Sequence, residues 1–298
     1  MGAPARYITP KRLPRIDGIR ALSQLSATLT SGIILIILLT LILQSGPALT
    51  QASSSLFTTQ WNPANGVYGI VPMVFGSVFV MMIAMAIALP IGLLSAISIT
   101  HIRHQPLRRV VKSTLEVLAG IPSIVYGLIG VAYVSVWVAG AFDLQSGRII
   151  LTAAFILSVM ILPTFLSLAE DAISSVPQAY RKNAAALGLY PYETQIAVIL
   201  PAAAPGIMSA ALLALGRALG ETMAVMLVIG SLDRLPSPLF NPLSSGQTIT
   251  SKLGREIGES AFGSVHFSVL VFMSLILVSL TIALTIASHL LFKRSKLQ

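Results

Sequence analysis

Arg217 and Glu221 stand inside one of the most apolar stretches of the chain, residues 206–230, and their chemistry is therefore considered first. The stretch is long enough to cross a bilayer as a helix, at about 1.5 Å per residue. An arginine at the centre of such a helix costs about 2.5–3.5 kcal/mol on insertion scales. Its guanidinium carries five donors and stays charged, so in a medium of low dielectric it offsets part of the desolvation of an anion. The stretch is thus the first candidate for a functional site.

The spacing of these two residues leaves their relationship open. They are four residues apart, so a continuous helix would place both on one face. The pair can be a buried structural ion pair, or Arg217 can be paired at rest and shared with an anion in transit. Glu221 can be ionised and hold Arg217, or burial can keep it protonated so that it donates a hydrogen bond. Gly216 and Gly220 form a small-xxx-small pair that lets another helix approach closely.

The composition indicates a membrane protein. The chain has 298 residues, of which 55% are hydrophobic and 10% are charged, whereas charged residues make up about a quarter of a soluble domain. Several long, nearly uncharged runs predict an all-α, polytopic membrane protein. The absence of cysteine excludes disulfides, thiolate metal sites and thiol nucleophiles. We interpret the net charge of +9 as basic cytoplasmic loops and predict no nucleic-acid binding.

Six segments are predicted to span the membrane, at about residues 25–43, 70–100, 112–140, 149–169, 206–230 and 267–292. With both termini in the cytoplasm, the inner segments hold 14 of the 19 Lys and Arg residues and the outer loops hold 4, in agreement with the positive-inside rule. The remaining one is Arg217. The chain is therefore predicted to consist of a basic cytoplasmic tail (1–24), one transmembrane domain (25–292) and a second basic tail (293–298).

Other polar residues give weaker signals. An intramembrane hydrolase needs a nucleophile with a base in reach, but the chain has no Gly-x-Ser-x-Gly and no histidine in mid-membrane, so we predict no catalytic residue. His101 and His104 have a spacing that could bind a metal, but they lie in a basic loop without a nearby carboxylate, so we predict no metal site. Glu116 is expected to pair with Lys112 or Arg109.

The segment 170–205 is predicted to be a cytoplasmic loop with two short helices. The first spans about residues 176–187 and ends at Gly188, where a left-handed residue is favoured. The second begins at Pro191 and runs until Pro201 stops it. Both are too short to span a membrane, so the segment is either an ordinary loop or a docking surface for a cytoplasmic partner.

The spacing within this loop resembles the EAA loop of ABC-importer permeases, in which Glu-Ala-Ala is followed by three residues, Gly, nine residues and Ile-x-Leu-Pro. Lys182 stands where the Glu is usual, Asn183 where the first Ala is, and Val198 where the Ile is. The resemblance implies a loop that docks on a cytoplasmic ATPase. Its docking residues would be Lys182, Asn183, Ala184, Gly188, Leu200 and Pro201.

A second motif is more specific. Residues 216–225, Gly-Arg-Ala-Leu-Gly-Glu-Thr-Met-Ala-Val, resemble the signature of Pst-type phosphate permeases, and the ending resembles the PstC-like subunit more than its PstA-like partner. Three further segments match the same family, namely 61–63, 119–127 and 248–251. The resemblance covers about residues 20–292 and implies the type I fold of ABC-importer permeases.

This resemblance implies an ATP-driven importer of inorganic phosphate in a prokaryotic plasma (inner) membrane. The chain would be surrounded by lipid and form the pathway with a PstA-like second permease. It would dock on a PstB-like ATPase dimer and receive phosphate from a PstS-like external binding protein. It would be non-catalytic and bind no cofactor, since ATP and magnesium are used by the partner ATPase. Arg217, Glu221 and Thr222 would line the substrate pathway.

Two alternatives stay open. The chain could be a permease for sulfate or another oxyanion. Permeases of the sulfate type resemble this chain around Arg217 but typically carry an aromatic residue where Thr222 stands, so Thr222 favours phosphate. A stand-alone secondary anion transporter would also use intramembrane charges. Co-purification with an ATPase supports the importer, whereas ion-driven transport by the isolated chain supports the secondary transporter.

Overall fold

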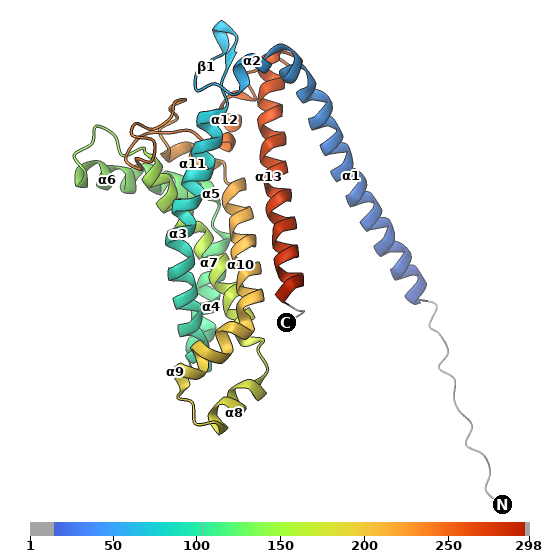
Figure 1. Ribbon diagram of the computed structural model, residues 1–298, viewed down its shortest axis with the longest axis vertical. Coiled ribbons are helices and arrows are strands. Elements are labelled where there is room, and N and C mark those ends of the chain that lie inside the picture. The colour runs from blue at the N-terminus through green and yellow to red at the C-terminus, as the bar shows by residue number, and fades with distance from the viewer. Residues whose placement is uncertain (1–14, 103, 296–298) are drawn as a thin grey trace, which may run out of the picture.

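The computed structural model describes residues 15–102 and 104–295 as a bundle of long helices with short elements at both ends (Figure 1). Most of the first predicted tail (1–14) and part of the second (296–298) lie outside the described residues. The helices are α1 (Arg15–Gln51), α2 (Ser53–Leu56), α3 (Val71–His101), α4 (Gln105–Gly120), α5 (Ser123–Ile129), α6 (Ser135–Ala141), α7 (Ile150–Ser174), α8 (Gln178–Ala186), α9 (Pro191–Glu193), α10 (Leu200–Gly220), α11 (Met223–Val228), α12 (Ile249–Glu256) and α13 (Val265–Ser295). Strands β1 (Trp61–Asn62) and β2 (Val67–Tyr68) form one antiparallel hairpin around the 3-10 turn Pro63–Asn65, and the segments Gly130–Val134 and Thr194–Ile199 are π-helical.

Within residues 15–102 and 104–295, six helical segments are long and apolar enough to cross a membrane, which confirms the predicted number of spans. They are Arg20–Gln51, Val71–Thr100, Ser123–Ala141, Ile150–Ser174, Pro191–Gly220 and Val265–Ile286. An even number of crossings returns the chain to the side on which it began. Accordingly, both described ends of the chain lie toward the end of the bundle that carries α8 (Figure 1). We call this the inner end, and we call the end with α2, the hairpin and α12 the outer end.

Helix α7 forms the centre of the bundle, because it is apolar on nearly every side and α3, α10 and α4 pack around it. Its buried side chains include Ile161 and Phe165. Gly92 of α3 lies directly against the Phe165 ring, where a Cβ atom would collide with it. The absence of a side chain at this position therefore permits the close approach of α3 and α7.

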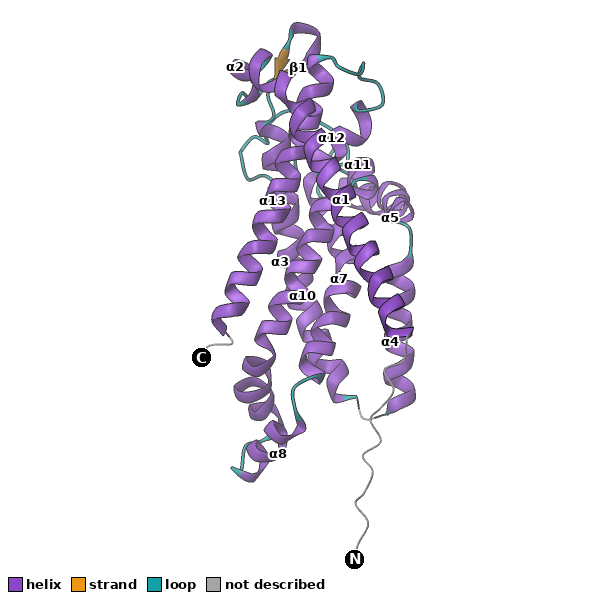
Figure 2. Ribbon diagram, turned by 90° about the vertical axis from the view of Figure 1, so that its right-hand side faces the viewer, coloured by secondary structure: helices purple, strands orange, loops and turns teal. Residues whose placement is uncertain are grey.

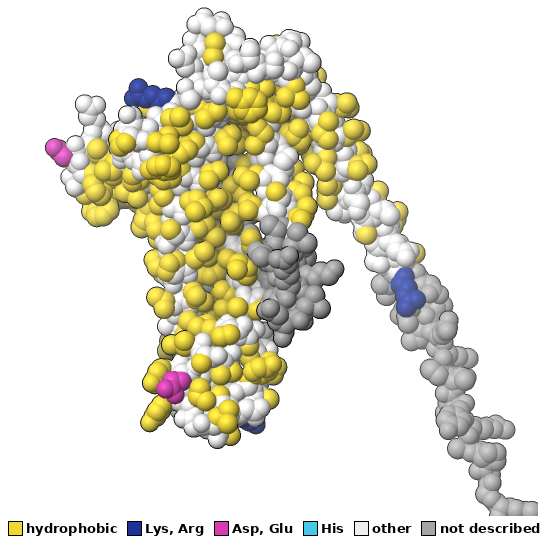
Figure 3. Space-filling model, viewed as in Figure 1, with side chains coloured by type: hydrophobic (Ala, Val, Ile, Leu, Met, Phe, Trp, Pro, Cys, Tyr) yellow, Lys and Arg dark blue, Asp and Glu magenta, His cyan; other side chains and the backbone are white. Residues whose placement is uncertain are grey.

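Helix α1 lies apart from this core and contacts the bundle through α13 (Figures 1 and 2). Its leucine and isoleucine side chains are mostly exposed. On the face shown in Figure 3, the flank of the bundle is largely hydrophobic, and the charged side chains gather toward its two ends. This distribution is that of a membrane protein, whose flank meets lipid and whose ends meet water.

Several predicted boundaries were wrong. The first helix begins at Arg15 and continues through Pro47 to Gln51, so the proline, which removes one intrahelical hydrogen bond and crowds the carbonyl four residues earlier, does not end it. The second short helix of the inner loop does not stop at Pro201, but passes through a π-helical segment into α10. The fifth span is therefore Pro191–Gly220 instead of 206–230.

The third predicted span, 112–140, was also wrong at its start. Helix α4 ends at Gly120, and Ile121 and Pro122 are extended before α5 begins (Ile121 φ −64°, ψ 130°). Helix α4 is a separate amphipathic helix that packs against the inner half of α7. The apolar span begins only at Ser123.

A buried carboxylate holds α4 in place. Glu170 of α7 is 0% exposed and forms ion pairs with Arg108 and Lys112, and Lys112 also bonds Asp171 (Nζ–Oδ1 3.1 Å). Burial alone would lower the pKa of Lys112, but its bonds to Glu170 and Asp171 raise the pKa above the ordinary value. The expected pairing of Glu116 was wrong, since Glu116 forms no ion pair with any residue that the structure describes.

The outer end is held together by a second buried charge. Lys252 of α12 has a side chain that is 2% exposed, and its ammonium group bonds Asp233 (2.6 Å) and Glu256 (2.5 Å) and lies 4.6 Å from the centre of the Trp61 ring. His266 at the start of α13 bonds the other oxygen of Glu256 (3.0 Å). These contacts join α12, α13, the hairpin and the loop after α11.

Candidate functional site

The motif that carries Arg217 and Glu221 is a broken helix. Helix α10 ends at Gly220, Glu221 is extended (φ −72°, ψ 124°), and α11 begins at Met223. The prediction that Arg217 and Glu221 share one face of a continuous helix was therefore wrong. Irregular backbone at membrane depth is tolerated only where protein buries it or where it lines a water-filled space. The backbone polar groups at the break must therefore be satisfied by other parts of the protein or by water.

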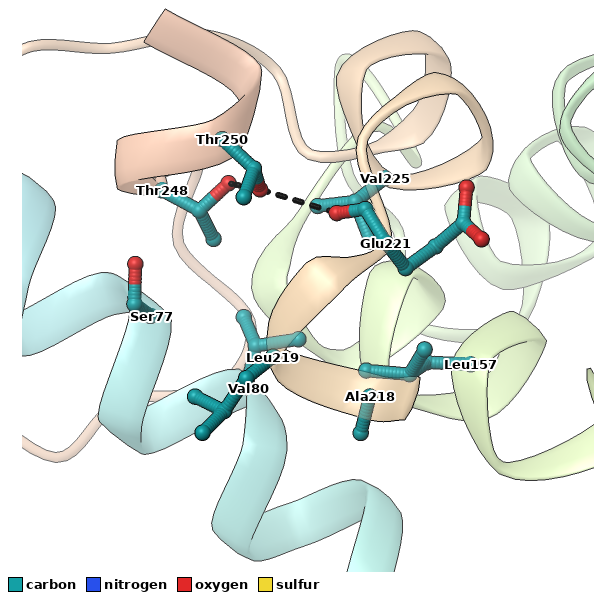
Figure 4. A pocket seen from close by; sticks show the side chains of 9 residues that line it. All are labelled: Ser77, Val80, Leu157, Ala218, Leu219, Glu221, Val225, Thr248 and Thr250. Carbon is teal, nitrogen blue, oxygen red and sulfur yellow. Dashed lines mark hydrogen bonds between the residues drawn. The ribbon is translucent and has the colours of Figure 1, made fainter. Parts of the chain in front are cut away.

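Helix α12 supplies hydrogen-bonding partners for the broken backbone. The hydroxyl of Thr250 donates to the carbonyl oxygen of Glu221 (2.8 Å), as the dashed line in Figure 4 shows. The Glu221 carboxylate points away from Thr250 in the same view and accepts a hydrogen bond from the backbone N–H of Ala224 (3.1 Å). Glu221 therefore caps the first turn of α11, where a negative charge is favourable.

Arg217 connects this break to the one between α4 and α5. Its Nη2 donates to the carbonyl oxygen of Ala119 (3.3 Å), and its Nη1 donates to the hydroxyl of Thr164 in the middle of α7 (2.7 Å). Ala119 lies in the last turn of α4, where carbonyl groups lack intrahelical partners and the helix dipole is negative. The guanidinium thus stabilises the end of one half-helix from the end of another.

Arg217 has no carboxylate partner in the part of the chain that the structure describes. Among the ion pairs of residues 15–102 and 104–295, none joins Arg217 to Glu221, so the structural ion pair considered from the sequence is not formed. Two of the five guanidinium N–H groups are used in the hydrogen bonds to Ala119 and Thr164. The side chain is exposed in the single chain, so the remaining donors can reach a ligand.

The glycines beside Arg217 face open space. No other part of the described chain lies within 4 Å of the positions that Cβ atoms would take at Gly216 and Gly220. The close helix approach expected from this pair is therefore not made within the chain. Thr222 is half-buried, and its methyl group lies next to Gly254 of α12.

The cavity directly behind the break is too small to be a pathway. It is lined by Ser77, Thr248 and Thr250 on its polar side and by apolar residues such as Leu157 and Leu219 on the other (Figure 4). Its volume is about 10 Å³, barely enough for one water molecule. Ser77 is also occupied structurally, since its hydroxyl accepts a hydrogen bond from Ile249 N–H (2.9 Å). The interior side of the break is thus packed, and Arg217 is not among the residues that line this cavity.

The inner loop contains the predicted first helix, α8, and its predicted end. Gly188 is left-handed (φ 82°), and the N–H groups of Gly188 and Leu189 donate to the carbonyls of Ala185 (3.0 Å) and Ala184 (3.2 Å). This is the double hydrogen bond of a Schellman motif, so the left-handed glycine predicted from the sequence is confirmed.

The remaining residues predicted for the docking loop are split between two elements. Lys182 and Asn183 are exposed on α8, whereas Ala184 is buried. Leu200 and Pro201 lie at the start of α10, on a helix that continues into the bundle. The sequence motif therefore covers both the exposed helix α8 and the start of α10, the helix that carries Arg217 near its other end.

The same inner end exposes large apolar side chains that the sequence motif did not single out, namely Tyr180, Leu187, Tyr190, Tyr192 and Ile196. The Tyr190 and Tyr192 rings are stacked at 6.1 Å and 12°. An exposed apolar group of this kind is typical of a protein interface. Ala119 and Thr164, the partners of Arg217, were also missed, since nothing in their local sequence indicates that they meet it.

Comparison with known proteins identifies the family. Residues 88–296 match the family described as binding-protein-dependent transport system inner membrane component. The match covers more than half of the chain, which therefore belongs to this family. The chain is accordingly a multi-pass membrane component of a transport system, and the class expected from the two motifs is confirmed.

Individual relatives agree with this family. The chain is 34% identical to the phosphate transport system permease protein PstC of Mesorhizobium japonicum, over 97% of this chain and 94% of that one. It is 35% identical to the probable ABC transporter permease protein YqgH of Bacillus subtilis, over 81% of this chain and 78% of that one. Both relatives are therefore similar over most of their length.

Solved structures agree on the fold. A permease chain of the MetNI methionine ABC transporter superposes with a TM-score of 0.61 at 18% identity, over 79% of this chain and 99% of that one. A chain of a bacterial ABC transporter involved in alginate import gives 0.60 at 13% identity, over 95% and 99%. The fold is thus that of type I ABC-importer permeases, as the resemblance implied.

Proposed function

We propose that this chain is the transmembrane permease subunit of an ATP-driven importer of inorganic phosphate in a prokaryotic plasma membrane. The observation that carries the proposal is Arg217, a cation at the junction of two broken helices for which the described residues provide no carboxylate partner. The relatives named phosphate transport system permease support the choice of substrate.

Arg217 acts as a fixed cation for the passing anion. Its hydrogen bonds to Ala119 and Thr164 hold the guanidinium plane, while the other N–H groups bind phosphate oxygens in a bidentate manner. The positive charge offsets part of the desolvation of phosphate at membrane depth. Since no carboxylate competes for it among the described residues, the cation is available without first breaking an ion pair.

Glu221 and Thr222 shape the break through which the anion passes. The carboxylate of Glu221 stabilises the first turn of α11 by accepting a hydrogen bond from Ala224 N–H. Thr222 offers a small hydroxyl where sulfate-type permeases typically carry an aromatic residue, and this difference favours phosphate. Both residues therefore line the pathway, whereas Arg217 supplies the positive charge that binds the anion.

The energy for transport comes from a partner. The EAA-like segment, with Lys182, Asn183, Ala184 and Gly188 on α8 and Leu200 and Pro201 on α10, docks on a dimeric ATPase that uses ATP and magnesium. The exposed tyrosines of the inner end extend this docking surface. The chain itself is non-catalytic and binds no cofactor.

Two further partners complete the importer. A PstA-like second permease covers the open face beside Gly216 and Gly220 and closes the pathway around Arg217. A PstS-like binding protein delivers phosphate at the outer end, where the hairpin and α12 are presented.

The test is ATP-driven uptake of labelled phosphate by the reconstituted complex, with sulfate as competitor, for the native chain and for Arg217→Gln. We expect phosphate-selective uptake that falls about 100-fold in the variant, since two or more hydrogen bonds to a charged group are lost. Assembly of each complex is checked by co-purification of the ATPase. Normal uptake by the assembled variant would overturn the role of Arg217. A preference for sulfate would overturn the substrate, and ion-driven uptake by the isolated chain would overturn the importer.

A further inference from the structure

A second cavity lies at the outer end and has a different set of lining residues from the small cavity behind the break. Its volume is about 400 Å³, and its walls come from the turn before α7, the end of α11 and the last turn of α12. A water molecule takes up about 30 Å³ in the liquid, so the cavity holds a small ion together with several waters. Its lining is more polar than apolar and includes Arg148, Arg255 and Glu259.

The two arginines of this cavity have no acidic partner within 4 Å among the described residues. The neighbouring Lys252 differs, because Asp233 and Glu256 neutralise it. Asp233 and Glu256 are thus engaged with Lys252, while Arg148 and Arg255 line one open cavity. With Glu259, the charged lining has a net charge of +1.

The backbone that carries Arg148 is held in position. Its N–H donates to Ser146 Oγ (3.2 Å), and its carbonyl accepts from Ser245 Oγ (2.9 Å). Gly230 packs directly against the same carbonyl, where a Cβ atom would collide, and it has the left-handed conformation that only glycine adopts readily (φ 88°). The next residue, Ser231, is also left-handed (φ 58°), and such a conformation is kept only where the surrounding structure imposes it. Both Gly230 and Ser231 line the cavity.

The cavity adjoins the proposed pathway. Gly254 of its lining lies against the methyl group of Thr222 and the sulfur of Met226, and a Cβ atom there would be 3.0 Å and 3.3 Å from these atoms. Met226 itself lines the cavity, one turn of α11 above the break. An ion held between Arg148 and Arg255 is therefore separated from Thr222 by a single layer of residues.

We propose that this cavity is an outer binding site for inorganic phosphate, in which Arg148 and Arg255 hold the oxyanion before it moves past Thr222 to Arg217. The inference rests on the proposed function, which supplies the direction of movement. Two guanidinium groups match the oxygens of a tetrahedral anion. Glu259 limits the net attraction, and transport requires a site that binds firmly enough to load but weakly enough to release.

The site can be tested by protection from chemical modification. Phenylglyoxal modifies accessible arginines, and mass spectrometry reads the extent at each position in the full complex in right-side-out membrane vesicles. We expect inorganic phosphate to protect Arg148 and Arg255. Arg234, an exposed arginine of the same outer loop that does not line the cavity, serves as the internal control and should stay reactive.

A quantitative test asks whether the loss of one arginine weakens the protection of the other by phosphate. In Arg148→Gln, the phosphate concentration that half-protects Arg255 should rise about ten-fold, because one charge-assisted hydrogen-bonding group is lost. Arg234→Gln should leave it unchanged. Assembly of each variant is verified by co-purification.

Two outcomes would overturn the inference. Phosphate that fails to protect either arginine, at concentrations that saturate uptake by the native complex, excludes the site but leaves the proposed function intact. Protection by the external binding protein alone, without an effect of free phosphate, identifies a protein-docking surface instead. Failure of the native complex to take up phosphate would contradict the proposed function, and the uptake assay described above detects it independently of the protection experiment.

Discussion

Arg217 and Lys252 are both cations placed among apolar helices, but the chain treats them in opposite ways. Lys252 is 2% exposed and has two carboxylate partners and an aromatic ring around its ammonium group. Arg217 is exposed, and its partners among the described residues are two neutral oxygens, a hydroxyl of α7 and a backbone carbonyl of α4. One charge is neutralised within the chain, and the other is positioned without being neutralised.

This difference separates a structural charge from a charge that is free to bind a ligand. The pairs of Lys252 hold α12 over the break, so that Thr250 can bond the Glu221 carbonyl. Arg217 keeps donors for a further oxygen ligand because hydrogen bonds to neutral groups orient it and leave its charge in place. The two cations should accordingly respond to mutation in different assays.

The largest effect is expected for uptake in Arg217 variants. Arg217→Lys keeps the charge but loses the planar fork, so uptake per assembled complex should fall about ten-fold, against about 100-fold for Arg217→Gln. The thermal stability of the complex should change little in either case. The measurement is labelled phosphate uptake, normalised to co-purified ATPase. Equal uptake by the lysine and arginine forms would mean that only charge matters at this position.

Lys252→Met should act on stability instead. The substitution leaves Asp233 and Glu256 without their cation, and we expect a loss of about 2 kcal/mol, below the range for fully buried pairs because both carboxylates are partly exposed. Thermal unfolding of the purified complex measures this, and Lys252→Arg is the charge-conserving control. If Lys252→Met left the stability unchanged but abolished uptake, Lys252 would act in transport as Arg217 does, and the distinction between a structural and a ligand-binding cation would be wrong.

Glu170→Gln probes the third charge cluster, at the inner end. Without the carboxylate, Arg108 and Lys112 lose their shared partner, so hydrogen exchange of the α4 amides should rise about ten-fold. The raised pKa of Lys112 means that its contribution is fully present at neutral pH and is lost only as pH rises through that pKa. In the native chain, the protection of the α4 amides relative to their intrinsic base-catalysed exchange rate should therefore fall only in strongly alkaline solution. Exchange that stays as slow in the variant would show that packing alone holds α4.

The smallest effect is expected for Glu221→Gln. The amide oxygen can still accept the hydrogen bond from Ala224 N–H, so assembly should be preserved and uptake should fall by no more than about three-fold, the cost of a weakened cap. Glu221→Ala, which removes the acceptor, is the matched comparison and should fall further. A loss in Glu221→Gln as large as that in Arg217→Gln would show that the negative charge itself takes part in transport.

Parts of the molecule could be predicted from local sequence. The six spans follow from long apolar runs, and the left-handed Gly188 follows from a helical pattern that ends at a glycine. The motif around Arg217 indicated the correct family. The roles of Arg217, Glu221, Thr222 and the docking residues stay predictions, which the experiments above address.

Other parts could not be predicted, because they depend on contacts between distant segments. Gly220 permits a helix to end but does not require it, since Gly216 lies within the same helix, and the partner of the freed Glu221 carbonyl is Thr250, 29 positions away. The same holds for Arg217, whose partners lie on α4 and α7. A local pattern placed Glu221 beside Arg217 on one face, and the break moved it to the cap of α11.

The sequence by itself determined that this chain is a six-span membrane protein of a binding-protein-dependent transport family, because hydropathy and motif spacing depend only on the order of side chains. Tertiary structure alone decided where the helices break and which cations are neutralised. Both depend on whether a backbone carbonyl or a carboxylate from elsewhere in the chain comes within hydrogen-bond distance, and in a low-dielectric interior that partner sets the conformation and the charge that remains.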